Sequence, residues 1–357
     1  MLKRLFLLIP ILLAFTVSYS QTGGYSIPIT IKPYKNAYIY LGYHYGKRKA
    51  LADSAYLDEN STGAFQNKKP LAPGIYFVTS PRREILFELL IDKQQQFSIV
   101  GDSTNLPVSI QFKNSPDNTM FRAYTIDINQ ASRDAQAASQ ALNKNPNAPD
   151  APQLRDKIQK TNRFIINYRD SIVKKYPSSF LATLFRAMEE PVVPPASKHP
   201  GGKYDTIYAF RYFKTHYWDG INLADDRLIR TPILEAKLDK YYNDIVAPDP
   251  DSISREVDYM LALSRPSPEM FKYLMVYFVQ KYINPPFMGQ DAVFVHLFER
   301  YINTGQAEFF TEQYKKHMSD RAYSLMANLI GQPASELLMT DTLGNLTPLS
   351  KVKADFG

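Results

Sequence analysis

The hydrophobic period of this chain changes near residue 113, and that change constrains the fold more than any other feature. Before it, apolar and polar residues alternate over short runs such as 25–31, 37–43 and 74–78. Turn-forming residues separate these runs at intervals of roughly 8–12 residues, which is typical of small all-β domains. The sequence therefore predicts a small antiparallel β sandwich over residues 21–113. Because proline lacks a backbone N–H, the strand that contains Pro28 is expected at a sheet edge.

After residue 113, apolar residues recur at steps of three and four, which predicts amphipathic helices. One such pattern runs from Phe121 to Leu142 and a second from Leu154 to Tyr176, with Asp150 as the expected N-cap of the second. Two long helices with a short connection are expected to pair antiparallel. Further helices are predicted at 180–188, 204–217, 231–245, from 249, from 267, and at 291–302, 307–317 and 319–329.

Two segments break this helical pattern. Residues 190–203 contain four prolines and two glycines, which predicts a mobile loop inside a helical domain spanning 114–329. Residues 330–357 return to short alternating runs and predict a β hairpin. The expected fold is therefore α+β: a small sandwich, an all-α domain and a short C-terminal hairpin.

The N-terminus has the features of a signal peptide. A basic start at Lys3 and Arg4 precedes an apolar run at 5–17, and small serine residues follow at positions 18 and 20. The apolar run is shorter than the roughly 20 residues that a membrane span needs. We expect cleavage after residue 20 and a soluble, exported product, periplasmic or associated with the cell envelope, without a membrane span.

Cysteine content and charge narrow the possible functions. The chain contains no cysteine, which excludes disulfides, thiol catalysis, thiolate metal sites and a lipid-modified N-terminal cysteine from the residues present. The formal net charge is +7, but lysine and arginine are spread evenly and form no basic run. Together with the expected export, this argues against nucleic-acid binding. No phosphate-binding loop, dinucleotide-binding turn or zinc motif is present, so no cofactor is predicted.

Two groups of residues are candidates for a binding surface. Tyrosines at 38, 40 and 43 in one predicted strand could form a sugar-stacking platform, although a half-buried sheet face is the simpler interpretation. The densest polar group lies at 216–226 and could hold a metal or perform acid–base chemistry, although helix capping and ion pairs with neighbouring arginines are the simpler interpretation. The candidate surface residues are Tyr38, Tyr40, Tyr43, His216, Trp218 and Asp219; no catalytic, cofactor-binding or metal-binding residue is assigned.

Three segments resemble known families. The β region, through Gly63-Ala64-Phe65 and Pro73-Gly74-Ile75-Tyr76, resembles an uncharacterised domain of secreted Gram-negative proteins that commonly precedes thioredoxin-like disulfide oxidoreductase domains. The helical region, through Leu228-Ile229-Arg230-Thr231-Pro232, resembles a second uncharacterised module that lies between the two. The tail, through Ile330-Gly331-Gln332-Pro333-Ala334 and Asp341-Thr342-Leu343-Gly344-Asn345, resembles the first strands of the redoxin-type thioredoxin fold.

This resemblance implies kinship with an envelope thiol–disulfide oxidoreductase, whose Cys-x-x-Cys would follow shortly after Gly357. The leading hypothesis is a non-catalytic accessory region that positions or selects substrate for a thioredoxin-like domain, with envelope proteins or a redox partner as its contacts. A stand-alone periplasmic glycan- or peptide-binding protein is the alternative. A metal- or carboxylate-dependent hydrolase at His216 and Asp219 is a third.

Overall fold

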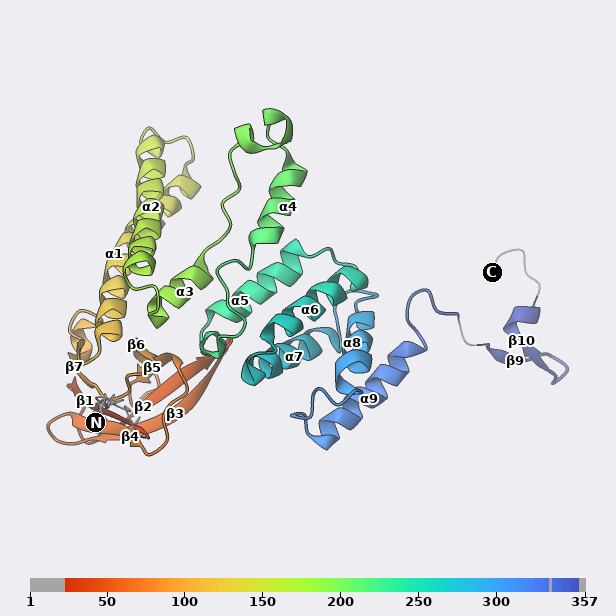
Figure 1. Cartoon of the computed structure of the whole chain (residues 1–357), viewed down its shortest axis with the longest axis horizontal. Coiled ribbons are helices and arrows are strands. Elements are labelled where there is room, and N and C mark those ends of the chain that lie inside the picture. The colour runs from red at the N-terminus through yellow and green to blue at the C-terminus, as the bar shows by residue number, and fades with distance from the viewer. Residues whose placement is uncertain (1–22, 334–335, 353–357) are drawn as a thin grey trace, which may run out of the picture.

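The computed structural model describes residues 23–333 and 336–352, and the predicted signal peptide at 1–20 lies outside them. Along the chain come a β sandwich, a helical region and a short two-stranded hairpin (Figure 1). The predicted α+β class is confirmed, as is the order of its three parts.

The sandwich consists of two four-stranded sheets. One has the strand order β4-β1-β7-β8 and the other β3-β2-β5-β6. The strands are β1 (Tyr25–Lys32), β2 (Ala37–Tyr45), β3 (Arg48–Leu57), β4 (Thr62–Asn67), β5 (Gly74–Thr79), β6 (Ile85–Ile91), β7 (Ser98–Asp102) and β8 (Gln111–Lys113). Alternate residues of both sheets fill the space between them, so that Ile27, Leu41 and Val78 are fully buried in one apolar core.

β1 departs from the sequence prediction in two ways. It runs parallel to β7, whereas all other strand pairs between described residues are antiparallel, because β7 crosses from the β6 side of the sandwich to the opposite sheet. β1 is also an interior strand and not the predicted edge. Pro28 is tolerated there because it lies between the isolated bridge at Ser26 and the β7 ladder that begins at Ile29.

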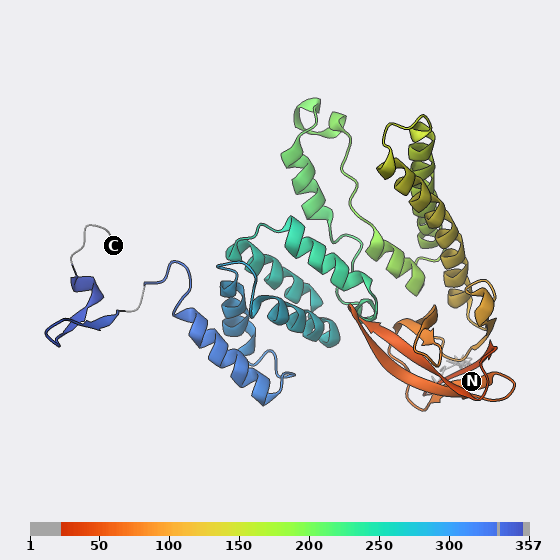
Figure 2. The same ribbon diagram turned by 180° about the vertical axis from the view of Figure 1, so that it is seen from behind.

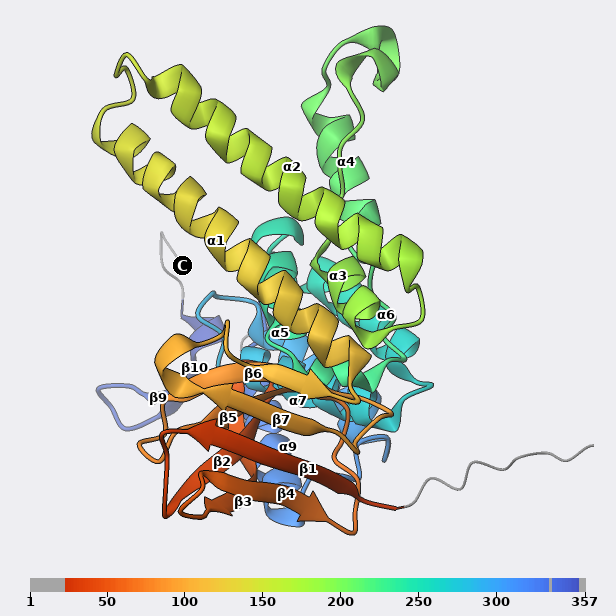
Figure 3. The same cartoon turned by 90° about the vertical axis from the view of Figure 1, so that its left-hand side faces the viewer.

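Nine α-helices follow in the described residues. They are α1 (Pro116–Lys144), α2 (Ala151–Lys175), α3 (Phe180–Met188), α4 (Thr206–His216), α5 (Ile233–Lys240), α6 (Pro250–Ser264), α7 (Pro268–Tyr282), α8 (Asp291–Leu297) and α9 (Glu312–Met326). α1 and α2 lie side by side and rise from the sandwich (Figures 1 and 3). None of the described helices is both long enough and apolar enough to cross a membrane.

Several helix boundaries follow the sequence closely, and the prediction fails only near α9. The predicted starts after Asp249 and Ser267 are confirmed, since each side chain accepts a hydrogen bond from the N–H three residues on. α2 also begins after its predicted N-cap residue, Asp150, although that side chain makes no capping hydrogen bond. The two helices predicted at 307–317 and 319–329 are wrong, because a single helix, α9, runs through Ser319.

The helical region shares its core with the sandwich. Ile75 of β5 and Leu90 of β6 face outward from their sheet and pack in one apolar cluster with Tyr124 and Phe185. The turn between β2 and β3 reaches the other end of the region, where the Lys47 N–H donates to the Glu235 carboxylate at 2.9 Å. Burial, and then the Glu235 charge, raises the pKa of Tyr273, whose hydroxyl donates to the same carboxylate at 2.8 Å.

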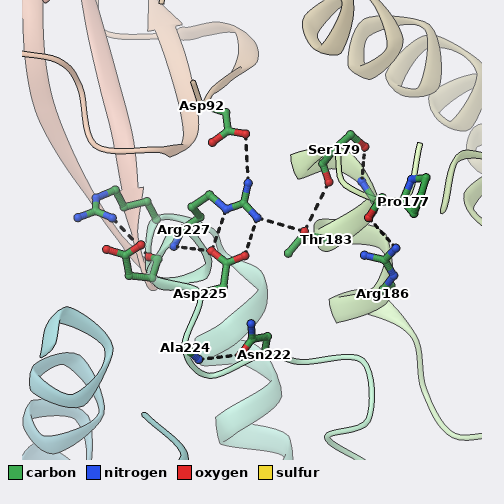
Figure 4. Close-up of polar contacts among 12 residues, drawn as sticks. Asp92, Pro177, Ser179, Thr183, Arg186, Asn222, Ala224, Asp225 and Arg227 are labelled. Atoms are coloured by element: carbon green, nitrogen blue, oxygen red, sulfur yellow. Dashed lines mark hydrogen bonds and ion pairs between the residues drawn. The ribbon is translucent and has the colours of Figure 1, made fainter. Parts of the chain in front are cut away.

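Arg227 connects three further segments (Figure 4). Its guanidinium lies 3.1 Å from Asp92 after β6, 2.6 Å from Asp225, and 3.3 Å from the Thr183 hydroxyl on α3. The hydrogen bonds to Asp225 raise the pKa of Arg227, so the guanidinium keeps its positive charge in this site. The sandwich and the helices are therefore joined by apolar packing and by partly buried charge pairs.

Beyond α9, β9 (Leu338–Thr340) and β10 (Leu346–Pro348) form an antiparallel hairpin. The hairpin lies apart from the helices in both views (Figures 1 and 2). The predicted C-terminal hairpin is confirmed. Its apolar side chains are largely exposed, with Leu343 at 84% and Leu346 at 69%.

Candidate binding groove on the outer sheet face

The three candidate tyrosines of β2 do not share one face. Tyr38 and Tyr40 point outward from the sandwich, whereas Tyr43 points inward and packs beside Tyr76 at a ring distance of 5.7 Å. Tyr38 is half exposed and meets Tyr56 of β3 edge to face at 5.2 Å. The strand period of two explains the separation, because positions 38 and 40 have the same parity and position 43 does not.

Tyr40 lies at the edge of a shallow groove on the outer face of the β3-β2-β5-β6 sheet. Gly42 and Phe77 are directly opposite in register, and a Cβ at Gly42 would collide with the Phe77 ring. The missing side chain thus lets the Phe77 ring lie flat across β2 and form the apolar floor. The remaining lining residues come from β3, β5, β6 and the turn before β6: Lys49, Ala50, Leu51, Thr79, Arg83 and Ile85.

Arg83 covers the ring of Tyr40. Its guanidinium carbon lies 3.4 Å from the ring centroid, a close cation–π stack. The turn that presents Arg83 is held by Ser80, whose buried hydroxyl accepts hydrogen bonds from the N–H groups of Arg82 and Glu84, each at 3.2 Å. Arg83 has a φ of +68°, which is rare for a residue with a Cβ and disfavours this backbone by about 1–3 kcal/mol. Strained backbone of this kind is found most often at active sites and ligand-binding sites.

The hydroxyl of Thr79 has no hydrogen-bond partner, although its oxygen is buried and the residue is only 6% exposed. Thr79 lies opposite Tyr40 in register and so faces the groove. An unpaired buried hydroxyl costs about 1–3 kcal/mol. A ligand polar group that reached Thr79 would recover that free energy.

The charge of the groove is positive. Among the described residues, neither Lys49 nor Arg83 forms a salt bridge, and Lys49 lies 5.8 Å above the Phe77 ring. Glu88, which is opposite Phe77 in register, pairs with His44 at 3.0 Å. The groove thus combines an apolar floor, an unpaired hydroxyl and two cations, which suits an apolar group attached to a carboxylate.

The second group of candidate residues divides in the structure. His216 and Asp219 are solvent-exposed at the end of α4, with Nδ1 and Oδ2 2.6 Å apart. Trp218 turns away from them and packs edge-on against Tyr217 and Tyr241, both at 5.1 Å. Asp225 caps a short 3₁₀ turn and pairs with Arg227, as the local interpretation predicted. In the described part of the chain, no three His, Asp or Glu side chains converge as metal ligands would.

Sequence reasoning found Tyr40 but missed Phe77, Thr79 and Arg83. The signal that would have found the groove is Gly42, since a glycine inside a strand often marks the close approach of another group. Thr79 carried no such signal, because its missing hydrogen bond depends on which side chains surround it.

The geometry thus defines an α+β protein with a cationic, aromatic-floored groove on its sandwich. Residues 156–324, from within α2 to within α9, match the model of a protein family described as a domain of unknown function (DUF5106). That match agrees with the predicted resemblance of the helical region to an uncharacterised module. No curated protein and no solved structure matches the chain.

Proposed function

We propose that these residues are a non-catalytic accessory region of an exported thiol–disulfide oxidoreductase, where they position or select protein substrates for a thioredoxin-like domain. The observation that carries the proposal is the C-terminal hairpin. A two-stranded sheet is marginally stable alone, and the apolar side chains of Leu338, Leu343 and Leu346 are exposed on it. Both properties suit the first strands of a larger sheet, which is what the tail resembles in sequence.

In this proposal the chemistry and the binding belong to different parts. The chain contains no cysteine, so thiol exchange would fall to a domain that begins with the hairpin. The sandwich and the helical region would supply binding surfaces. The basic and apolar residues at the N-terminus support export to the periplasm, where disulfide exchange has substrates.

The coding DNA beyond codon 357 provides a direct test. We expect an in-frame or next-frame Cys-x-x-Cys shortly after that codon, and a protein extended through it that reduces the disulfides of insulin in the presence of a dithiol. Substituting serine for both cysteines of the motif is the matched control and should abolish the activity. If the DNA encodes no such motif in either frame, the proposal loses its main support.

The groove favours a second candidate function, a stand-alone periplasmic binding protein. Because Arg83 covers one face of Tyr40, this ring is poorly placed to stack on a sugar, and the two unpaired cations favour an acidic peptide over a neutral glycan. Peptide and glycan arrays probed with the mature chain would separate the two ligand classes. Binding to acidic peptides that Arg83→Gln weakens, and that Arg163→Gln on the exposed part of α2 leaves unchanged, would support this function. Array binding confined to glycans would count against it.

A further inference from the structure

The sandwich has an open side between β6 and β8. On the opposite side the two sheets are connected by the turn from β3 to β4, where the Asp58 N–H donates to the Thr62 carbonyl at 3.0 Å. β6 and β8 are each the last strand of their sheet, and no ladder joins them. Only side chains cross the gap, such as the rings of Phe87 and Phe112 at 6.3 Å. On this side, β6 therefore has no strand partner.

The side-chain amide of Asn118 already pairs with part of that edge of β6, because it makes the two backbone hydrogen bonds that a neighbouring strand would make. The Leu90 N–H donates to Asn118 Oδ1 at 2.6 Å, and Asn118 Nδ2 donates to the Leu90 carbonyl at 2.9 Å. Along an antiparallel strand, alternate residues direct both backbone groups to the same side. The N–H and carbonyl of Glu88 therefore also point away from β5. No hydrogen bond to either group is found outside the β5–β6 pair in the described residues.

A cavity of about 230 Å³ lies against this unpaired part of β6. Three consecutive residues of the strand line it (Leu86, Phe87 and Glu88), so the strand presents its edge to the cavity and not one face. The opposite wall is apolar, and one face of α1 closes the top; these residues are Leu106, Pro107, Ile110, Phe112, Arg122, Thr125 and Asn129. α1 contacts both β6 and β8, which places it across the open side of the sandwich (Figure 3).

The guanidinium of Arg122 lines the cavity and has no carboxylate partner among the described residues. One of its terminal N–H groups donates to the Val108 carbonyl at 2.5 Å, but its Nε is buried and has no partner. Arg122 forms no salt bridge with any described residue. A carboxylate in the cavity would accept the missing hydrogen bond and neutralise the charge.

We infer that the edge of β6 around Glu88 binds an extended polypeptide segment, which adds to the sheet as a strand and places an acidic side chain on Arg122. Backbone hydrogen bonds to Glu88 supply affinity for any extended chain, and the apolar wall with Arg122 selects segments in which apolar and acidic residues alternate. The inference rests on the substrate-positioning part of the proposed function and names its substrate class as unfolded or extended protein.

The test uses a short fluorescein-labelled peptide in which valine and glutamate alternate, titrated into the full-length chain. We expect saturable binding and slowed amide exchange at Glu88. A peptide N-methylated on the residues that would pair with β6 should bind at least tenfold more weakly, since it cannot donate to the edge. Unchanged affinity of the N-methylated peptide would overturn the inference.

Arg122→Gln tests the acidic contact without altering the strand. We expect it to weaken binding of the Val/Glu peptide roughly tenfold, because a charge-assisted hydrogen bond is lost. The same variant should hardly affect a peptide with glutamine in place of glutamate. Arg163→Gln on α2, away from the cavity, is the matched control and should bind as wild type. Equal losses for both peptides would refute the contact. The readout here is peptide binding and not thiol exchange. Peptide binding can therefore be absent even if a downstream Cys-x-x-Cys is found, and it can be present even if no such motif is found.

Discussion

Replacing Asn118 of α1 by alanine should be among the most destabilising single substitutions where the helical region meets the sandwich. Asn118 is 1% exposed, and its amide makes three hydrogen bonds, two to the Leu90 backbone and one to Ser115 Oγ at 2.9 Å. Asn118→Ala leaves the buried N–H and carbonyl of Leu90 unpaired, at about 1–3 kcal/mol each. The better helix propensity of alanine offsets about 0.5 kcal/mol. We therefore expect the free energy of unfolding to fall by about 2–5 kcal/mol.

Urea unfolding followed by the fluorescence of Trp218, the single tryptophan, and by circular dichroism would measure this loss. Asn129→Ala, on an exposed position of the same helix, is the matched control and should shift stability by no more than about 0.5 kcal/mol. Asn118→Asp adds a pH signature. Burial beside the Leu90 carbonyl would raise the pKa of the new carboxyl, so the variant should lose stability as the pH rises above about 4. A loss below about 1 kcal/mol for Asn118→Ala would refute the reasoning.

Three further substitutions test other parts of the structure. Gly46 has a φ of +56° and a methyl group there would collide with the Glu235 carboxylate, so Gly46→Ala should lower the urea midpoint by an amount equivalent to about 1–3 kcal/mol. The hydrogen bond from the Ser252 N–H lowers the pKa of Asp249 in the folded protein. The capping carboxylate therefore stabilises the fold at any pH above the pKa of Asp249 in the unfolded chain. This stabilisation is lost as the pH falls through the lowered pKa of the folded protein. Asp249→Asn should keep the cap and remove that part of the acid dependence of the melting temperature. Thr79→Val removes an unpaired buried hydroxyl and should raise the free energy of unfolding by about 1 kcal/mol, measured by urea titration, while weakening any ligand that uses the groove.

The features that the sequence predicted well depend on neighbours along the chain. The residue range of α3 was predicted without error, and the starts of α6 and α7 follow from Asp249 and Ser267, because capping needs only three residues of local sequence. The alternating runs at 25–31, 37–43 and 74–78 correspond to β1, β2 and β5 for the same reason, whereas β8 was not predicted. The error at α9 is also local: Ser319 resembles a helix start, but the chain continues as helix through it.

The features that the sequence could not predict depend on which segments meet in space. The interior position of β1 and its parallel partner β7 are set by a crossing between sheets, which no single run of residues encodes. The groove is similar. Tyr40, Thr79 and Arg83 come from β2, β5 and the turn before β6, and the stack and the unpaired hydroxyl exist only once those elements are adjacent.

The position of the groove follows from how the helical region covers the sheet. Ile75, Phe77 and Thr79 alternate along β5 and so point from the same outer face. Ile75 is buried in the apolar cluster of the helical region, whereas Phe77 and Thr79 line the groove. A single strand face thus begins under the helices and ends at the groove. The secondary structure changes at residue 113, but one apolar cluster contains residues from both sides of that position. The helices that bury Ile75 therefore determine how much of the outer sheet face remains free to bind a ligand.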